Sequence, residues 1–110
     1  MDKSVPGRTV WQMGAHERFA NPAGAVQGGF LAALADSAMS TAAVTYLEGR
    51  RARVANVEMK ISFLAPARTG TTLTATATVV KGGRRVAFLE TEIHDGDAVV
   101  ARASSTYLYT

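Results

Sequence analysis

One short stretch of this chain gathers residue types that can polarise a carbonyl group. It reads NPAGAVQGGF, begins at Asn21 and is followed by a lone carboxylate at Asp36. A helix that starts at Gly28 and Gly29 would present backbone N–H groups without partners and the positive end of its dipole. Because glycine has no side chain, a ligand carbonyl could approach these amides closely, as in an oxyanion site. Asn21 and Gln27 could contribute their side-chain amides.

Asp36 is the acidic group that could complete such a site. It falls within an alanine-rich segment, where a lone carboxylate is costly to bury unless it is paired or used. Such a buried carboxylate suits a general base. Two simpler interpretations stay open. The glycines Gly28 and Gly29 could only let the helix pack close to a sheet, and Asp36 could lie at the solvent edge or cap nearby groups through Ser37 or Ser40.

The spacing of these groups limits how they can cooperate. Gly28 and Asp36 are eight residues apart, which is about 12 Å along a helix. Gln27 and Asp36 differ by about 180° around the same helix. Asp36 therefore cannot easily act on a carbonyl held at Gly28 of its own chain. If both groups take part, we expect them to come from different subunits of a two-fold dimer.

The composition excludes several classes of protein. The 110 residues are expected to form one domain over 1–110, and with 47% apolar residues they can bury a core. The chain has no cysteine, which removes a disulfide framework, an iron–sulfur cluster and a thiol nucleophile. Its two histidines, His16 and His94, are far apart and have no carboxylate at metal-ligand spacing. We therefore expect neither a metal nor another cofactor.

Charge and hydropathy bear on partners and location. The net charge of +3 suits an anionic small ligand as well as it suits nucleic acid. Aromatic residues make up 7% of the chain and form no stacking motif, so we expect no nucleic-acid partner. The first ten residues contain no apolar leader, and together with the lack of cysteine this favours the cytoplasm. Residues 25–44 are apolar but rich in alanine and interrupted by polar groups, which favours a buried helix over a membrane span.

The first half of the chain should contain one strand and one long helix. We expect the strand over Thr9–Phe19, a turn over Asn21–Gly24 and the helix over Ala25–Leu47, where apolar residues recur at spacings of three and four. In the turn, Pro22 and Gly24 favour non-helical backbone. We expect Glu48–Arg51 to close the helix, because glycine and basic residues suit a C-terminus.

The second half should consist of strands. We expect them over Val54–Leu64, Thr71–Val80, Arg85–His94 and Ala98–Tyr109, with turns at 81–84 and 95–97. Thr71–Val80 has the clearest alternation, in which apolar residues face one way and threonines the other. The order predicts a strand, a helix and a four-stranded meander that curls around a helix apolar nearly all round. An exposed edge would invite a second copy, so we expect a homodimer with a continuous sheet.

The motif and its spacing resemble those of a known family. Asn21, Gly28, Gly29 and Asp36, with the later strand NVEMKISFLAP from Asn56, resemble the hotdog-fold acyl-CoA thioesterases of the phenylacetate-pathway (PaaI-like) type. The resemblance implies an α+β hotdog fold, in which a curved antiparallel sheet wraps one long central helix. It also implies hydrolysis of an acyl-CoA to a free acid and CoA without a cofactor, at a site shared between two chains. Small members of this family commonly form tetramers, so we expect a homo-oligomer beyond the dimer.

The resemblance also implies roles for single residues. Asp36 would be the nucleophile or general base, Gly28 the source of the polarising amide, and Asn21 a residue that orients the site. Asn56 stands where relatives often have a Ser or Thr that positions water. Gln27 replaces the histidine of the family. Glutamine can orient and donate a hydrogen bond but cannot transfer a proton, so activity should suffer if that position titrates.

Substrate binding would involve two further groups of residues. We expect the acyl group in a crevice between helices, lined by Phe30, Leu31, Leu34 and Phe63, and we expect Gly29 to bind the substrate as well. The phosphates of CoA need cations, and the best candidates are Lys81, Arg84 and Arg85, although a solvated charged turn explains these three equally well.

Two other functions stay open. The replacement at Gln27 would also suit a module that binds or senses acyl-CoA without catalysis. A hydratase or dehydratase of this fold would need a histidine paired with an acid, and the chain has no histidine between Ala20 and Phe88.

Overall fold

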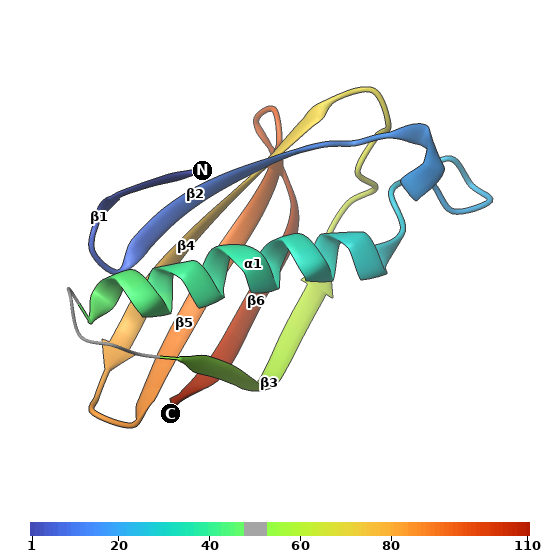
Figure 1. Cartoon of the computed structure of the whole chain (residues 1–110). Helices are drawn as coiled ribbons and strands as arrows, with labels where there is room; N and C mark the ends of the chain where they lie inside the picture. The colour runs from blue at the N-terminus through green and yellow to red at the C-terminus, as the bar shows by residue number, and fades with distance from the viewer. Residues whose placement is uncertain (48–52) are drawn as a thin grey trace.

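The structure is a computed structural model that describes residues 1–47 and 53–110. In this part of the chain six strands form one antiparallel sheet, and the helix α1 lies across one face of it (Figure 1). The sheet has the order β1-β2-β4-β5-β6-β3. This confirms the expected hotdog arrangement of one curved antiparallel sheet and one long helix. The elements are β1 (Asp2–Val5), β2 (Arg8–Gly14), the 3-10 helix η1 (Glu17–Phe19), α1 (Gly28–Tyr46), β3 (Val54–Phe63), β4 (Thr72–Gly82), β5 (Val86–Asp95) and β6 (Ala98–Tyr109).

Alternation along the strands places the core between the sheet and α1. In β4, Leu73, Ala75 and Ala77 are fully buried, while the threonines between them face the outside, as the sequence predicts. On the helix the buried residues are mostly alanines, and the sheet contributes more alanines opposite them. Because these side chains are small, α1 can lie close to the sheet.

The helix is covered on one side only, which corrects the expectation of a helix wrapped nearly all round. Its buried face carries Leu31, Ala35 and Met39, whereas Ala33 and Val44 point away from the sheet and are exposed. A single sheet curls around about half of a helix, so the other face stays open in this protomer.

The strand order corrects the expected four-stranded meander. Of the four strands expected in the meander, only β4, β5 and β6 follow one another in the sheet, and β3 pairs with β6 at the far edge. The segment 64–71 carries the chain from β3 across the ends of β6 and β5 to β4. It is held there by bonds from Leu64 N to the Val100 carbonyl (2.8 Å) and from Arg68 N to the Asp95 carboxylate (3.3 Å). Alternation within a strand does not reveal its neighbours, so this crossover was not predictable from the pattern.

The N-terminal region also differs from its prediction. The expected strand over Thr9–Phe19 is β2 followed by η1, because the His16 side chain accepts a hydrogen bond from Arg18 N and begins the short helix there. The strand β1 was not anticipated. The turn before α1 is confirmed, with Gly24 at φ 85°. The predicted closure of the helix at 48–51 lies outside the described residues.

Candidate active site

Asp36 lies half-buried on α1, at the side of the helix that faces β3 and β6. Its Oδ1 atom accepts a hydrogen bond of 2.6 Å from the Tyr107 hydroxyl and one of 3.1 Å from Asn56 Nδ2. Asn56 Nδ2 also lies 3.4 Å from the Tyr107 oxygen and 3.5 Å from Ser105 Oγ. The alternative in which Asp36 is capped through Ser37 or Ser40 receives no support. The Ser40 hydroxyl donates to the Ser37 backbone carbonyl at 3.2 Å, and within the described residues no hydrogen bond joins either serine side chain to Asp36.

Tyr107 is the functional candidate that the sequence did not reveal. Its side chain is on the inner face of β6 and is 1% exposed. Burial, and then the neighbouring Asp36 carboxylate, raise the pKa of the Tyr107 hydroxyl above its ordinary value. A signal was present in the alternation of β6, which points Ala103, Ser105 and Tyr107 inward. A buried tyrosine hydroxyl needs a partner, and Asp36 is the acidic residue of the facing helix.

The loop before α1 fixes where the helix begins. Val26 N donates to the Ala67 carbonyl at 2.8 Å, and Gln27 N donates to the Phe19 carbonyl at 2.7 Å. The next two amides, those of Gly28 and Gly29, find no acceptor within the described part of the chain. The helix start therefore presents two N–H groups that a ligand oxygen could occupy.

The two glycines at the helix start differ in their surroundings. A Cβ atom on Gly28 would lie 2.8 Å from Cζ of Phe63, whereas one on Gly29 would have no neighbour within 4 Å. Gly28 therefore makes room for the ring of Phe63, as the packing interpretation expected. Gly29 faces open space, as a ligand-binding amide requires. Phe63 is 54% exposed, so its ring borders the helix start and could also contact a ligand.

Asn21 and Gln27 lie near the helix start but differ in what they do there. Asn21 Oδ1 accepts hydrogen bonds from Ala23 N (2.9 Å) and Ala25 N (3.1 Å), so it shapes the loop. Gln27 is the N-cap residue, is exposed, and makes no capping hydrogen bond with its side chain. The side-chain amide of Gln27 is therefore available to a ligand.

The predicted substrate-binding residues fall in separate places. Phe30 is partly buried and stacks on Phe19 with ring centroids 4.4 Å apart, and Leu34 belongs to the core with 5% exposure. The basic residues Lys81, Arg84 and Arg85 are exposed at the turn between β4 and β5. This turn lies near the C-terminal end of α1, away from Gly28 (Figure 1).

One protomer does not bring the two halves of the predicted site together. Asp36 contacts Asn56 and Tyr107 near the middle of α1, while Gly28 lies at its start beside Phe63. Gly28 and Asp36 are eight positions apart along the helix, which corresponds to about 12 Å. This distance agrees with the conclusion from the sequence spacing that Asp36 cannot easily act on a carbonyl held at Gly28 of its own chain.

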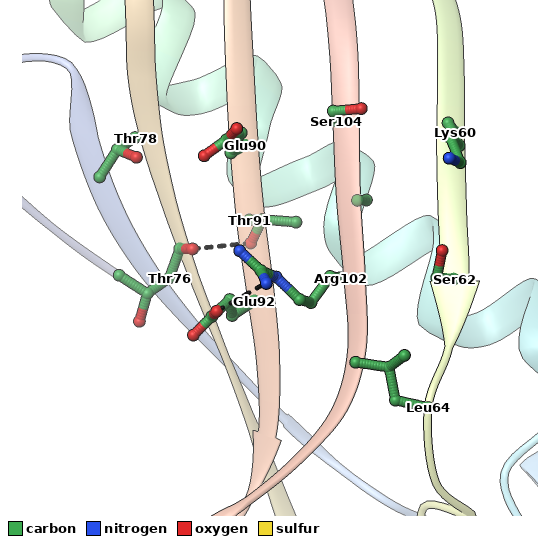
Figure 2. A pocket seen from close by; sticks show the side chains of 11 residues that line it. Lys60, Ser62, Leu64, Thr76, Thr78, Glu90, Thr91, Glu92, Arg102 and Ser104 are labelled. Carbon is green, nitrogen blue, oxygen red and sulfur yellow. Dashed lines mark hydrogen bonds and ion pairs between the residues drawn. The ribbon is translucent and has the colours of Figure 1, made fainter.

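A separate hollow of about 610 Å³ lies on the outer face of the sheet, opposite α1 (Figure 2). None of the predicted catalytic residues lines it. Its charges are partly paired, because Glu92 contacts Arg102 Nε at 3.3 Å and His94 Nε2 at 3.2 Å. We call this hollow the outer groove; its lining residues are Lys60, Ser62, Leu64, Thr76, Thr78, Glu90, Thr91, Glu92, Arg102, Ala103 and Ser104.

Two further observations concern metals and membranes. Within residues 1–47 and 53–110, no three His, Asp or Glu side chains come close enough together to hold a metal ion. Over the same residues, no helix combines the length and apolar character needed to span a membrane.

Comparison with known proteins identifies the family. Residues 23–102 match the thioesterase superfamily, and this range includes the helix start, Asp36 and Asn56. Together with the hotdog fold, the match shows that the chain belongs to the thioesterase superfamily.

Individual proteins that are similar to this chain also support this family assignment. Human acyl-coenzyme A thioesterase 13 is 33% identical over 90 residues, which cover 82% of this chain and 63% of the human protein. The chain thus spans less than two thirds of the length of that relative. The PaaI protein from the phenylacetic acid degradation operon of E. coli has a TM-score of 0.88 at 28% identity, covering 94% of this chain and 73% of PaaI. A phenylacetic acid degradation-related protein from Ralstonia eutropha has a TM-score of 0.87 at 29% identity, covering 96% and 81%.

Proposed function

We propose that the protein is an acyl-CoA thioesterase that hydrolyses an acyl-CoA thioester to a free acid and CoA. The observation that carries this proposal is the Asp36 carboxylate, held by Asn56 and Tyr107 on the central helix of a thioesterase-superfamily fold. A relative named as an acyl-coenzyme A thioesterase supports the choice of thioester. The composition without cysteine supports a cytoplasmic location as part of the proposal.

The proposed site is shared between two subunits. β3 ends the sheet, and its outer edge has no partner strand among the described residues. Val57 and Phe63 of this strand and the adjacent Leu64 are all more than half exposed. Pairing with β3 of a second copy would extend the sheet and cover these side chains. The open faces of the two helices would then lie side by side and antiparallel, with Gly28 of the partner subunit opposite Asp36.

The chemistry follows from these groups. The thioester carbonyl oxygen accepts hydrogen bonds from the N–H groups of Gly28 and Gly29, with the Gln27 amide beside them. Asp36 of the facing subunit attacks the carbonyl carbon or removes a proton from the water that does so. The tetrahedral oxyanion is stabilised by the same N–H groups, and its collapse breaks the C–S bond and releases CoA as the thiolate. If Asp36 is the nucleophile, the product of this step is a mixed anhydride, and a water molecule then hydrolyses it to the free acid and the Asp36 carboxylate. Asn56 orients the carboxylate or the water, and Asn21 holds the loop before the helix.

The substrate would lie across the dimer. In antiparallel helices, the β4–β5 turn of the subunit that provides Asp36 lies on the same side as Gly28 of the partner subunit. Lys81, Arg84 and Arg85 could then hold the phosphates of CoA at the mouth of the site. Phe30 and Phe63 would border the acyl group.

The substrate class can be tested with a panel of acyl-CoA esters. We expect the purified protein to release free thiol from at least one member of a panel of aromatic, short-chain and long-chain acyl-CoA esters. The measurement is a continuous thiol assay with a binding titration run beside it. Tight binding of an acyl-CoA without thiol release would contradict hydrolysis and favour the non-catalytic binding module, for which the exposed Gln27 in place of histidine is the structural argument.

Subunit mixing tests the shared site. Asp36→Asn removes the carboxylate, and Gly28→Pro removes one amide hydrogen at the first helical position, where proline is tolerated. Each variant alone should be inactive. Co-expressed in equal amounts, they should form mixed dimers in which one of two sites is intact, and activity should return to about a quarter of the wild-type value.

The mixing experiment needs one control and has one contrary outcome. Mixing either variant with itself under the same conditions should restore nothing. Activity that stays at the level of the single variants, in a preparation shown to contain mixed dimers, would contradict a site shared between subunits.

We further propose that two dimers join into a tetramer through the outer face of the sheet. The outer groove carries Glu90 and Glu92 on β5, next to Arg102 on β6 and Lys60 on β3. A two-fold axis between β5 and β6 would place the acidic strand of one dimer against the basic strands of the other. Light scattering on the wild type should give the mass of four chains, and a mass of two chains would contradict the tetramer while leaving the dimer in place.

A further inference from the structure

Tyr107 donates the shorter of the two hydrogen bonds that the Asp36 carboxylate accepts. Its hydroxyl lies 2.6 Å from Asp36 Oδ1 and 3.2 Å from the backbone carbonyl of the same residue. We propose that Tyr107 is a positioning residue: with Asn56 it immobilises Oδ1 of Asp36, so that Oδ2 is the oxygen presented to the thioester or to the attacking water. This inference rests on the proposed function and adds to it the reacting atom of the carboxylate and the residue that fixes it.

The two carboxylate oxygens of Asp36 differ in the hydrogen bonds that they accept. Oδ1 accepts bonds from both Tyr107 and Asn56. Among the described residues, no hydrogen bond or ion pair engages Oδ2. A carboxylate with two donors on one oxygen cannot rotate freely about its Cβ–Cγ bond. Its second oxygen therefore keeps a fixed direction, which is what an attacking group in a near-attack geometry requires.

The fold places both hydrogen-bond donors next to Oδ1 of Asp36. Tyr107 and Asn56 are register partners on β6 and β3, and the register shifts between Asn56 and Glu58. The extra residue of this bulge is Val57, which has no partner and is 60% exposed. Without it, Asn56 would share a face with Glu58, which bonds Thr106 on the outer face. The bulge turns the Asn56 amide inward, as bulges beside active sites often do.

The Tyr107 hydroxyl remains a hydrogen-bond donor at neutral pH. Burial and the nearby Asp36 carboxylate raise the pKa of Tyr107, so its hydroxyl keeps its proton throughout the neutral range. Because the hydroxyl lies beneath the carboxylate and is almost fully buried, it does not touch the substrate. Its effect must pass through Asp36.

A matched pair of variants tests the proposal. Tyr109 is the next inward-facing tyrosine of β6, and its hydroxyl donates to the Ala43 carbonyl of the same helix at 3.1 Å. Tyr107→Phe and Tyr109→Phe each remove one tyrosine hydroxyl that donates to α1, but only the first touches Asp36. We expect Tyr107→Phe to lower kcat by about 10- to 100-fold with KM changed by less than about threefold. Tyr109→Phe should leave both constants near the wild-type values, while thermal unfolding shows a similar loss of stability in the two variants.

The outcomes separate this inference from the proposed function. Equal kcat values for Tyr107→Phe and Tyr109→Phe, with Asp36→Asn inactive, would overturn the role of Tyr107 and leave the thioesterase proposal intact. An active Asp36→Asn variant would instead overturn the proposed function.

A second variant keeps the test available if Tyr107→Phe does not fold. Fluorinated tyrosine introduced at position 107 retains the ring and the hydroxyl but makes the hydroxyl a stronger donor. It should draw charge from the Asp36 carboxylate and lower kcat several-fold. The same substitution at position 109 should not, and an equal response at both positions would overturn the proposal.

Discussion

Replacing Asp36 by asparagine should abolish thioester hydrolysis while the fold and the dimer persist. Asparagine has the same shape, and its side-chain oxygen can still accept the bonds from Asn56 and Tyr107. It can neither attack a carbonyl carbon nor accept a proton from water. We expect kcat to fall by about 10²- to 10⁴-fold, the range typical of a lost general base. A thiol-release assay on the best acyl-CoA of the panel measures the loss, and light scattering checks the assembly.

The control for this variant removes the same charge from the neighbouring strand. Glu58 lies on β3 two residues from Asn56, but it faces the outside of the sheet and bonds Thr106 there. Glu58→Gln should leave kcat and KM unchanged. If Asp36→Asn turned over substrate as fast as Glu58→Gln, the catalytic role of Asp36 would be refuted.

Replacing Gly28 by proline should remove much of the stabilisation of the oxyanion. Gly28 is the first residue of α1, and its N–H has no acceptor within the described residues, so the helix loses no internal bond when proline takes this position. Gln27, the preceding residue, already has the extended backbone that a following proline requires (φ −63°, ψ 138°). Loss of one oxyanion donor costs about 10²- to 10³-fold in kcat, and steady-state kinetics should show a loss of this size.

Gly28→Ala separates the missing amide hydrogen from the added bulk. Alanine keeps the N–H but introduces the same Cβ, which would meet the ring of Phe63 at 2.8 Å. Because Phe63 is 54% exposed, its ring has room to shift, and we expect only a few-fold loss of kcat. Similar losses for alanine and proline would show that space beside Phe63, and not the amide, is what the reaction needs.

Local elements were largely predictable because they depend on neighbouring residues. The alternation in Thr71–Val80 correctly predicted which face of β4 is buried, and β6 has the predicted bounds of Ala98 and Tyr109. The turn at Gly24 followed from its residue types. The helix was predicted three residues too early, at Ala25 instead of Gly28. Residues 25–27 instead form two isolated β-bridges and donate backbone hydrogen bonds to residues outside the helix. Those contacts are not visible in a local pattern.

In the candidate site, too, some features follow from the sequence and others only from the tertiary structure. The sequence by itself determined that Asp36 and Gly28 are too far apart on one helix to act together, because the helical rise fixes that distance. It also determined the chemistry that each group can offer. Only the tertiary structure decided that β3 pairs with β6, that a bulge at Val57 turns Asn56 inward, and that the Tyr107 hydroxyl reaches Asp36. Asn56 and Tyr107 are 51 residues apart in sequence, and Asp36 and Tyr107 are 71 residues apart. Their contacts depend on strand register and on how the helix packs on the sheet, which no local periodicity encodes.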